Sequence, residues 1–87
     1  MITRIMLLPT VDAARRELAS RPPATADAAR LATLVRHADA VVSRAAALRC
    51  LAADLGIDAT LAMAFAAEAL IRIDGMIQRQ LDRMRAE

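Results

Sequence analysis

The single histidine, His37, is the side chain best suited to proton or phosphoryl transfer, because imidazole titrates near neutral pH. It falls beside the apolar stripe of a long predicted helix, where a phosphorelay histidine would lie partly exposed. The run from Arg36 to Val41, however, lacks the Lys and Gly that usually follow the histidine in phosphotransfer domains. We therefore interpret His37 as a boundary residue hydrogen-bonded to a neighbour. A phosphotransfer protein or small helical enzyme that uses His37 is the third functional hypothesis.

A second group of polar residues surrounds Glu68, which lies in an otherwise apolar stretch. Arg72 follows four residues later, the favourable order for an ion pair on a helix. Antiparallel pairing across a tight hairpin would place Glu68 opposite Ala45, next to Arg44. The sequence thus predicts an ion cluster of Arg44, Glu68 and Arg72 that sets the helix register, because an unpaired buried carboxylate is costly to keep charged. The alternative is a polar pocket for an anionic ligand.

No other arrangement of residues indicates catalysis, and we expect neither a metal nor a cofactor. One histidine, one cysteine and scattered carboxylates show no metal-ligand spacing, and two glycines form no phosphate-binding loop. Ser20, Ser43 and Cys50 have no evident base nearby in the sequence. A lone Cys50 excludes an internal disulfide and suits a reducing cytoplasm, and we interpret it as a small packing residue.

The element that organises the chain is a helix predicted over residues 25–55, with Thr25 as its N-cap and Asp27 in its first turn. Apolar residues repeat there every 3.5 positions over four heptads, which is typical of a helix that lies along another helix. Small Ala side chains at the first heptad positions, including Ala45, favour close approach of two backbones. Gly56 follows where a left-handed residue would close the last turn.

A third helix is predicted over residues 58–85, capped by Asp58, so that a short turn joins two long antiparallel helices. Its first half is apolar on nearly every side, which one neighbouring helix cannot cover. We therefore predict an all-α homodimer that forms a four-helix bundle. The predicted core and interface residues are Leu31, Leu34, Val41, Ala45, Leu48, Leu55, Leu61, Phe65, Leu70 and Ile77.

The N-terminal part is predicted as an extended arm or short strand over residues 1–9 and a short helix over residues 10–20, capped by Thr10. Arg21, Pro22 and Pro23 would end that helix. A strand followed by two helices resembles the ribbon-helix-helix family of DNA-binding proteins over residues 2 to about 43. The resemblance implies that alternate strand residues face the major groove, but among Thr3, Ile5 and Leu7 only Thr3 suits base edges.

Composition limits the functional classes further. Eighty-seven residues make a single domain, and a chain this short is marginal as a lone monomer. The net charge of +2 and one aromatic residue do not favour nucleic acid, and no stretch is long enough to span a membrane. We expect a non-enzymatic, cytoplasmic adaptor, accessory or regulatory module that contacts itself and a larger protein through helices. The alternative is a small DNA-binding regulator.

Overall fold

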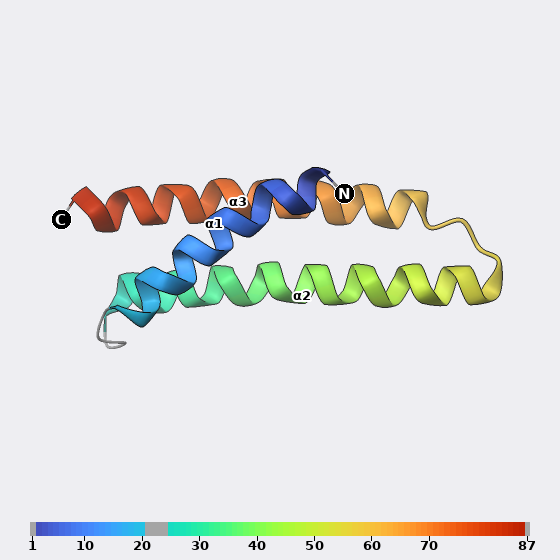
Figure 1. Cartoon of the computed structure of the whole chain (residues 1–87), viewed down its shortest axis with the longest axis horizontal. Coiled ribbons are helices and arrows are strands. Elements are labelled where there is room, and N and C mark those ends of the chain that lie inside the picture. Colours follow the sequence, from blue (N-terminus) through green and yellow to red (C-terminus); the bar gives the residue numbers. More distant parts are fainter. Residues whose placement is uncertain (1, 21–24, 87) are drawn as a thin grey trace.

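The computed structural model describes residues 2–20 and 25–86, which form three helices and contain no strand (Figure 1). Helix α1 spans Ile2–Ala19, α2 spans Ala26–Leu55 and α3 spans Thr60–Ala86. Helices α2 and α3 run antiparallel as a long hairpin, and α1 crosses them at the end that carries the C-terminus. The all-α prediction is confirmed. The predicted break at Arg21, Pro22 and Pro23 lies outside the described residues.

The ends of α2 form as the sequence predicts. The Thr25 hydroxyl accepts a hydrogen bond from the backbone N–H of Ala28 at 3.0 Å, which satisfies one of the unpaired donors of the first turn. At the other end Gly56 has φ 68°, in the left-handed region that only glycine adopts without strain. The N–H groups of Gly56 and Ile57 then bond the carbonyls of Ala53 and Ala52, which closes the helix as a Schellman motif.

Helix α3 begins at Thr60, two residues after Asp58. Asp58 Oδ1 accepts hydrogen bonds from the Thr60 hydroxyl and, at 2.9 Å, from the Thr60 backbone N–H. These two bonds hold the start of the helix, as a capping side chain does. They also lower the pKa of Asp58 below 3.8, because both donors stabilise the charged carboxylate.

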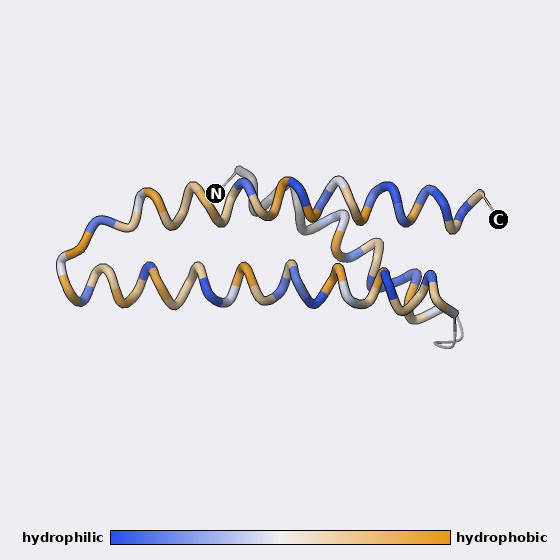
Figure 2. The backbone as a smooth tube through the Cα atoms, turned by 180° about the vertical axis from the view of Figure 1, so that it is seen from behind, coloured by the Kyte–Doolittle hydropathy of each residue, from blue (hydrophilic) through white to orange (hydrophobic). Residues whose placement is uncertain are grey.

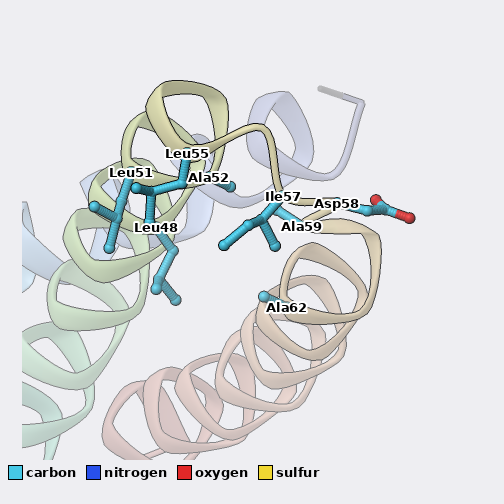
Figure 3. A pocket seen from close by; sticks show the side chains of 8 residues that line it. All are labelled: Leu48, Leu51, Ala52, Leu55, Ile57, Asp58, Ala59 and Ala62. Carbon is cyan, nitrogen blue, oxygen red and sulfur yellow. The ribbon is translucent and has the colours of Figure 1, made fainter.

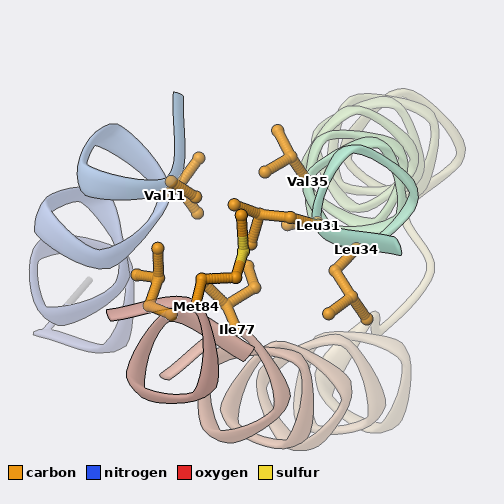
Figure 4. Packing of buried hydrophobic residues seen from close by; sticks show 9 residues of the cluster. Val11, Leu31, Leu34, Val35, Ile77 and Met84 are labelled. Carbon is orange, nitrogen blue, oxygen red and sulfur yellow. The ribbon is translucent and has the colours of Figure 1, made fainter. Parts of the chain in front are cut away.

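The hydrophobic core lies where all three helices meet, at the open end of the hairpin (Figure 4). Leu31 and Ile77 are fully buried at its centre, and Met84 is 1% exposed. Polar contacts border this core, since Gln80 Nε2 donates to Asp27 Oδ1 at 3.1 Å and an ion pair joins Arg15 to Asp39. The buried cluster consists of Val11, Ala14, Leu31, Leu34, Val35, Ala38, Ile77, Leu81 and Met84.

The prediction of an arm or strand over residues 1–9 is wrong for the described residues 2–9, which belong to α1. Pro9 stands inside this helix, where a proline lacks the N–H for a backbone hydrogen bond and crowds the carbonyl four residues earlier, at a cost of about 3 kcal/mol. The packing of Val11 and Ala14 against α2 and α3 favours a helix that continues through the proline. Thr10 is therefore not an N-cap: it is buried, and its Oγ1 accepts a hydrogen bond from Gln78 Nε2 at 3.3 Å.

The molecule is elongated, with extents of 50 × 20 × 17 Å and a radius of gyration of 14.9 Å. A compact domain of this length would have a radius of gyration of about 12 Å. The difference arises because α2 and α3 extend well beyond the part that α1 covers (Figure 1).

Substituting Ala38 tests the close packing at the open end. Ala38 is 3% exposed, so Ala38→Leu must displace core atoms, and we expect it to lower the free energy of unfolding by about 1–3 kcal/mol. Ala46→Leu is the matched control, because Ala46 is exposed on the same helix and Leu is nearly as good a helix former. Chemical denaturation measures both; equal midpoints would contradict the packing described.

The hydrogen bonds of Asp58 predict a dependence of stability on pH. A carboxylate whose pKa is lowered by folding stabilises the fold above its ordinary pKa, and the contribution disappears as pH falls through the lowered value. The wild-type protein should therefore have a higher melting temperature than Asp58→Asn at neutral pH. The difference between the two melting temperatures should disappear as pH falls below 3.8. Thermal melts followed by circular dichroism measure the gap; a constant difference down to pH 2 would count against this role for Asp58.

Candidate interaction surface

The closed end of the hairpin carries six large apolar side chains that face solvent, which we call the tip surface. Their exposed fractions range from 47% for Leu48 to 86% for Leu61, and the single aromatic residue, Phe65, is 77% exposed. Scattered single apolar residues are ordinary on a protein surface, but six large ones at one end of a small hairpin are typical of an interaction site. The tip surface consists of Leu48, Leu51, Leu55, Ile57, Leu61 and Phe65.

The tip surface lies at the end of the hairpin where only two helices are present. At the open end, α1 covers the groove between α2 and α3, and the apolar stripes of all three helices are buried. Helix α1 does not extend to the tip, where α2 and α3 each cover only part of the other. Figure 2 shows hydrophobic colours dominating α2 and α3 near the turn, whereas α3 becomes strongly hydrophilic toward its C-terminus.

A hollow of about 170 Å³ opens between the two helices at the tip (Figure 3). Leu48, Leu51 and Leu55 of α2 form one wall, and Ala62 of α3 stands on the other side. The small side chains of Ala52 and Ala59 leave the space between these walls empty. The hollow is therefore apolar, and it is shaped to take an apolar side chain rather than a polar ligand.

Three arginines lie on the same face of the hairpin as the tip surface, at its other end. Arg30, Arg79 and Arg83 line an open hollow with Met76 and Gln80, and no residue of α1 contributes to it. Eighteen residues are five complete turns of an α-helix, so Arg30 shares a stripe with Leu48, and Arg79 with Leu61. The same spacing relates Arg83 to Phe65. This uncovered face of the hairpin is therefore apolar at the tip and basic at the open end.

The guanidinium groups of this arginine cluster make no ion pair with the carboxylates of the described side chains. Gln80 beside them is 3% exposed, and its amide donates to Asp27. Sequence reasoning missed the cluster, and it missed Leu51 and Ile57 of the tip. The 18-residue spacing was the available signal, but its meaning depends on knowing which face α1 covers.

The predicted core and interface residues separate into three groups along the hairpin. Those nearest the open end are buried: Leu31, Leu34 and Ile77. Val41, Ala45 and Leu70 are half-buried along the middle. Leu48, Leu55, Leu61 and Phe65 at the tip are exposed in this single chain, so their place in an interface stays a prediction.

The predicted cluster of Arg44, Glu68 and Arg72 forms only in part. Arg72 Nε lies 3.2 Å from Glu68 Oε1, but both side chains are more than half exposed, and Arg44 makes no ion pair with a described residue. The reason is the register of the hairpin. Gln80 pairs with Asp27, and extending that pairing places Glu68 opposite Asp39, about 7 Å along the axis from Arg44. This exposed pair contributes little to stability.

The remaining candidate residues do not converge on a site. His37 is exposed and forms no hydrogen bond with a described residue, so the expected bond to a neighbour is wrong. Cys50 is also exposed, which corrects its interpretation as a packing residue. Within residues 2–20 and 25–86, no group of three or more His, Cys, Asp or Glu side chains could hold a metal ion. None of the helices there is long and apolar enough to cross a membrane.

Comparison of the chain with protein-family models, with curated proteins and with solved structures gave no match.

The separation of Arg44 from Glu68 can be measured with a double-mutant cycle. Glu68→Gln should lower the free energy of unfolding by about 0.5 kcal/mol or less, because exposed i,i+4 pairs contribute about 0.3–0.5 kcal/mol. Arg44→Gln should be neutral, and the two changes should add without coupling. Arg72→Gln is the positive control, because its loss should couple to Glu68→Gln. A coupling of 1 kcal/mol or more between positions 44 and 68 would instead support the predicted ion cluster of Arg44, Glu68 and Arg72.

Proposed function

We propose that this protein is a non-enzymatic helical interaction module, an adaptor, accessory or regulatory protein of the cytoplasm. It works as a homo-oligomer through helix-helix contacts, and a larger protein partner is compatible with the same mode of contact. The observation that carries the proposal is the tip surface, where six large apolar side chains from α2, α3 and their connection face solvent together. An apolar surface of this extent is stabilised when another apolar surface removes it from water.

The distribution of polar groups argues against an enzyme. General acid–base catalysis needs titratable side chains that converge within hydrogen-bond reach of a substrate. His37 is exposed, Gln78 bonds Thr10 beneath α1, and Glu68 pairs with Arg72 near the middle of the hairpin. These groups lie on different parts of the molecule, and the hollow at the tip is lined almost wholly by apolar side chains.

A DNA-binding regulator is the second candidate, and the arginine cluster favours it. Three guanidinium groups without a paired carboxylate can contact a phosphate backbone. The ribbon-helix-helix form of this hypothesis loses its basis, because residues 2–9 are helical instead of forming a strand. What remains is a small basic patch on a chain of net charge +2, which suits salt-sensitive rather than sequence-specific binding.

Sedimentation of charge variants tests the proposed function. At micromolar concentration, wild type should sediment at about twice the chain mass of 9.4 kDa. The double variant Leu51→Asp, Leu61→Asp should sediment as a folded monomer, because both side chains are exposed in the single chain and association would bury the new charges.

Ala46→Asp is the control for this experiment, since Ala46 is exposed and lies off the uncovered face. It should leave the sedimentation of the protein unchanged. A wild-type protein that is monomeric and fully helical at these concentrations would contradict the proposal of a homo-oligomer. Preferential binding of one DNA duplex over others at physiological salt would instead favour the hypothesis of a DNA-binding regulator.

A further inference from the structure

The exposed surface of the chain is large enough for a stable interface with a second copy of the chain. The accessible surface is 6177 Å², whereas a folded monomer of 9.4 kDa has about 5,000 Å². The excess, about 1,200 Å², exceeds the roughly 800 Å² that each partner buries in a stable protein interface. A second tip surface supplies an apolar area of equal size, and two-fold symmetry makes such a surface complementary to itself.

Charge decides how two uncovered faces can align. Parallel alignment over the full length would bring the two arginine clusters, Arg30, Arg79 and Arg83, against each other, and like charges repel across an interface. Antiparallel alignment over the full length would press each arginine cluster onto the partner's leucines and strip it of water. Antiparallel overlap of the two tips alone buries the apolar surfaces and leaves both arginine clusters in solvent.

Within that alignment we propose that Phe65 of each chain occupies the tip hollow of a second copy, against Leu48, Leu51 and Ala62. Phe65 is the only aromatic residue, it is 77% exposed, and it does not line the hollow of its own chain. Placing Phe65 opposite the partner's Ala62 brings Asp58 at one tip opposite position 69 of the other. The overlap therefore ends beside the exposed Glu68–Arg72 ion pair, whose Glu68 is the first charged residue of α3.

This arrangement rests on the proposed homo-oligomer. The overall length of the dimer tests the tip overlap separately from the existence of the dimer. The overlap covers about 12 residues, from position 58 to position 69, or roughly 18 Å, so two chains of 50 Å should give a dimer of about 80 Å. Small-angle X-ray scattering of the wild-type protein measures the maximum dimension. A dimer of 50–55 Å would mean full-length alignment and would overturn the tip overlap while leaving the homo-oligomer intact.

Substitution of Phe65 tests the insertion itself. An aromatic anchor in a pocket is the typical hot spot, and each dimer contains two, so Phe65→Ala should raise the dissociation constant about 1,000-fold. Ile71→Ala is the matched control: Ile71 is a large side chain of the same helix, 55% exposed, but it lies off the stripe of Leu61 and Phe65. Ile71→Ala should leave the dissociation constant within about threefold, and circular dichroism should show both variants helical.

The outcomes separate the inference from the proposed function. If Phe65→Ala dimerises as tightly as wild type, Phe65 insertion is wrong although the homo-oligomer stands. If both Phe65→Ala and Ile71→Ala dissociate, contact extends around α3 and the uncovered face is not the interface. If wild type is a helical monomer, both proposals fall. A monomer that cosediments with anionic phospholipid vesicles would assign the tip surface to a lipid bilayer.

Discussion

Two helices packed side by side cannot surround each other's apolar stripes, and the whole molecule is shaped by this constraint. At the open end the third helix resolves it: Val11 and Ala14 of α1 close the core over Leu31 and Ile77. Beyond the reach of α1 the same two helices continue with large apolar residues that stay exposed within the described part of the chain. The tip surface does not continue the buried core, because its α2 and α3 side chains lie on the face that carries Arg30, Arg79 and Arg83 at the open end.

Local signals in the sequence predicted the hairpin well because they act over a few residues. The Thr25 cap, the left-handed Gly56 and the side chain of Asp58 each depend on backbone groups within three or four positions. The helix through Pro9 was not predictable in this way. A proline followed by Thr10 and Asp12 has the form of a helix start, and only the packing of Val11 and Ala14 against two distant helices favours continuation.

The sequence indicated which apolar residues belong to the candidate site, but not how the charged residues are arranged around them. The all-round apolar character of α3 before residue 73 indicated surface left over for a partner, and Leu61 and Phe65 are indeed the most exposed large apolar residues. The cluster around Glu68 failed, because a shift of a few residues in hairpin register moves Arg44 more than a turn away. The relation between the tip and Arg30, Arg79 and Arg83 required the position of α1, which no spacing within α2 or α3 encodes.

Helix α2 is continuous over 30 residues, yet its two halves have different protection against solvent. The backbone amides near Leu31 and Ala38 are beneath core side chains, so their hydrogen exchange requires the three-helix core to open. The amides near Leu51 sit in a two-helix segment with exposed side chains, and local fraying from the turn releases them at lower cost in free energy. One unbroken helix therefore contains two units of stability, and the proposed association at the tip would stabilise the weaker one by an amount that rises with the logarithm of protein concentration.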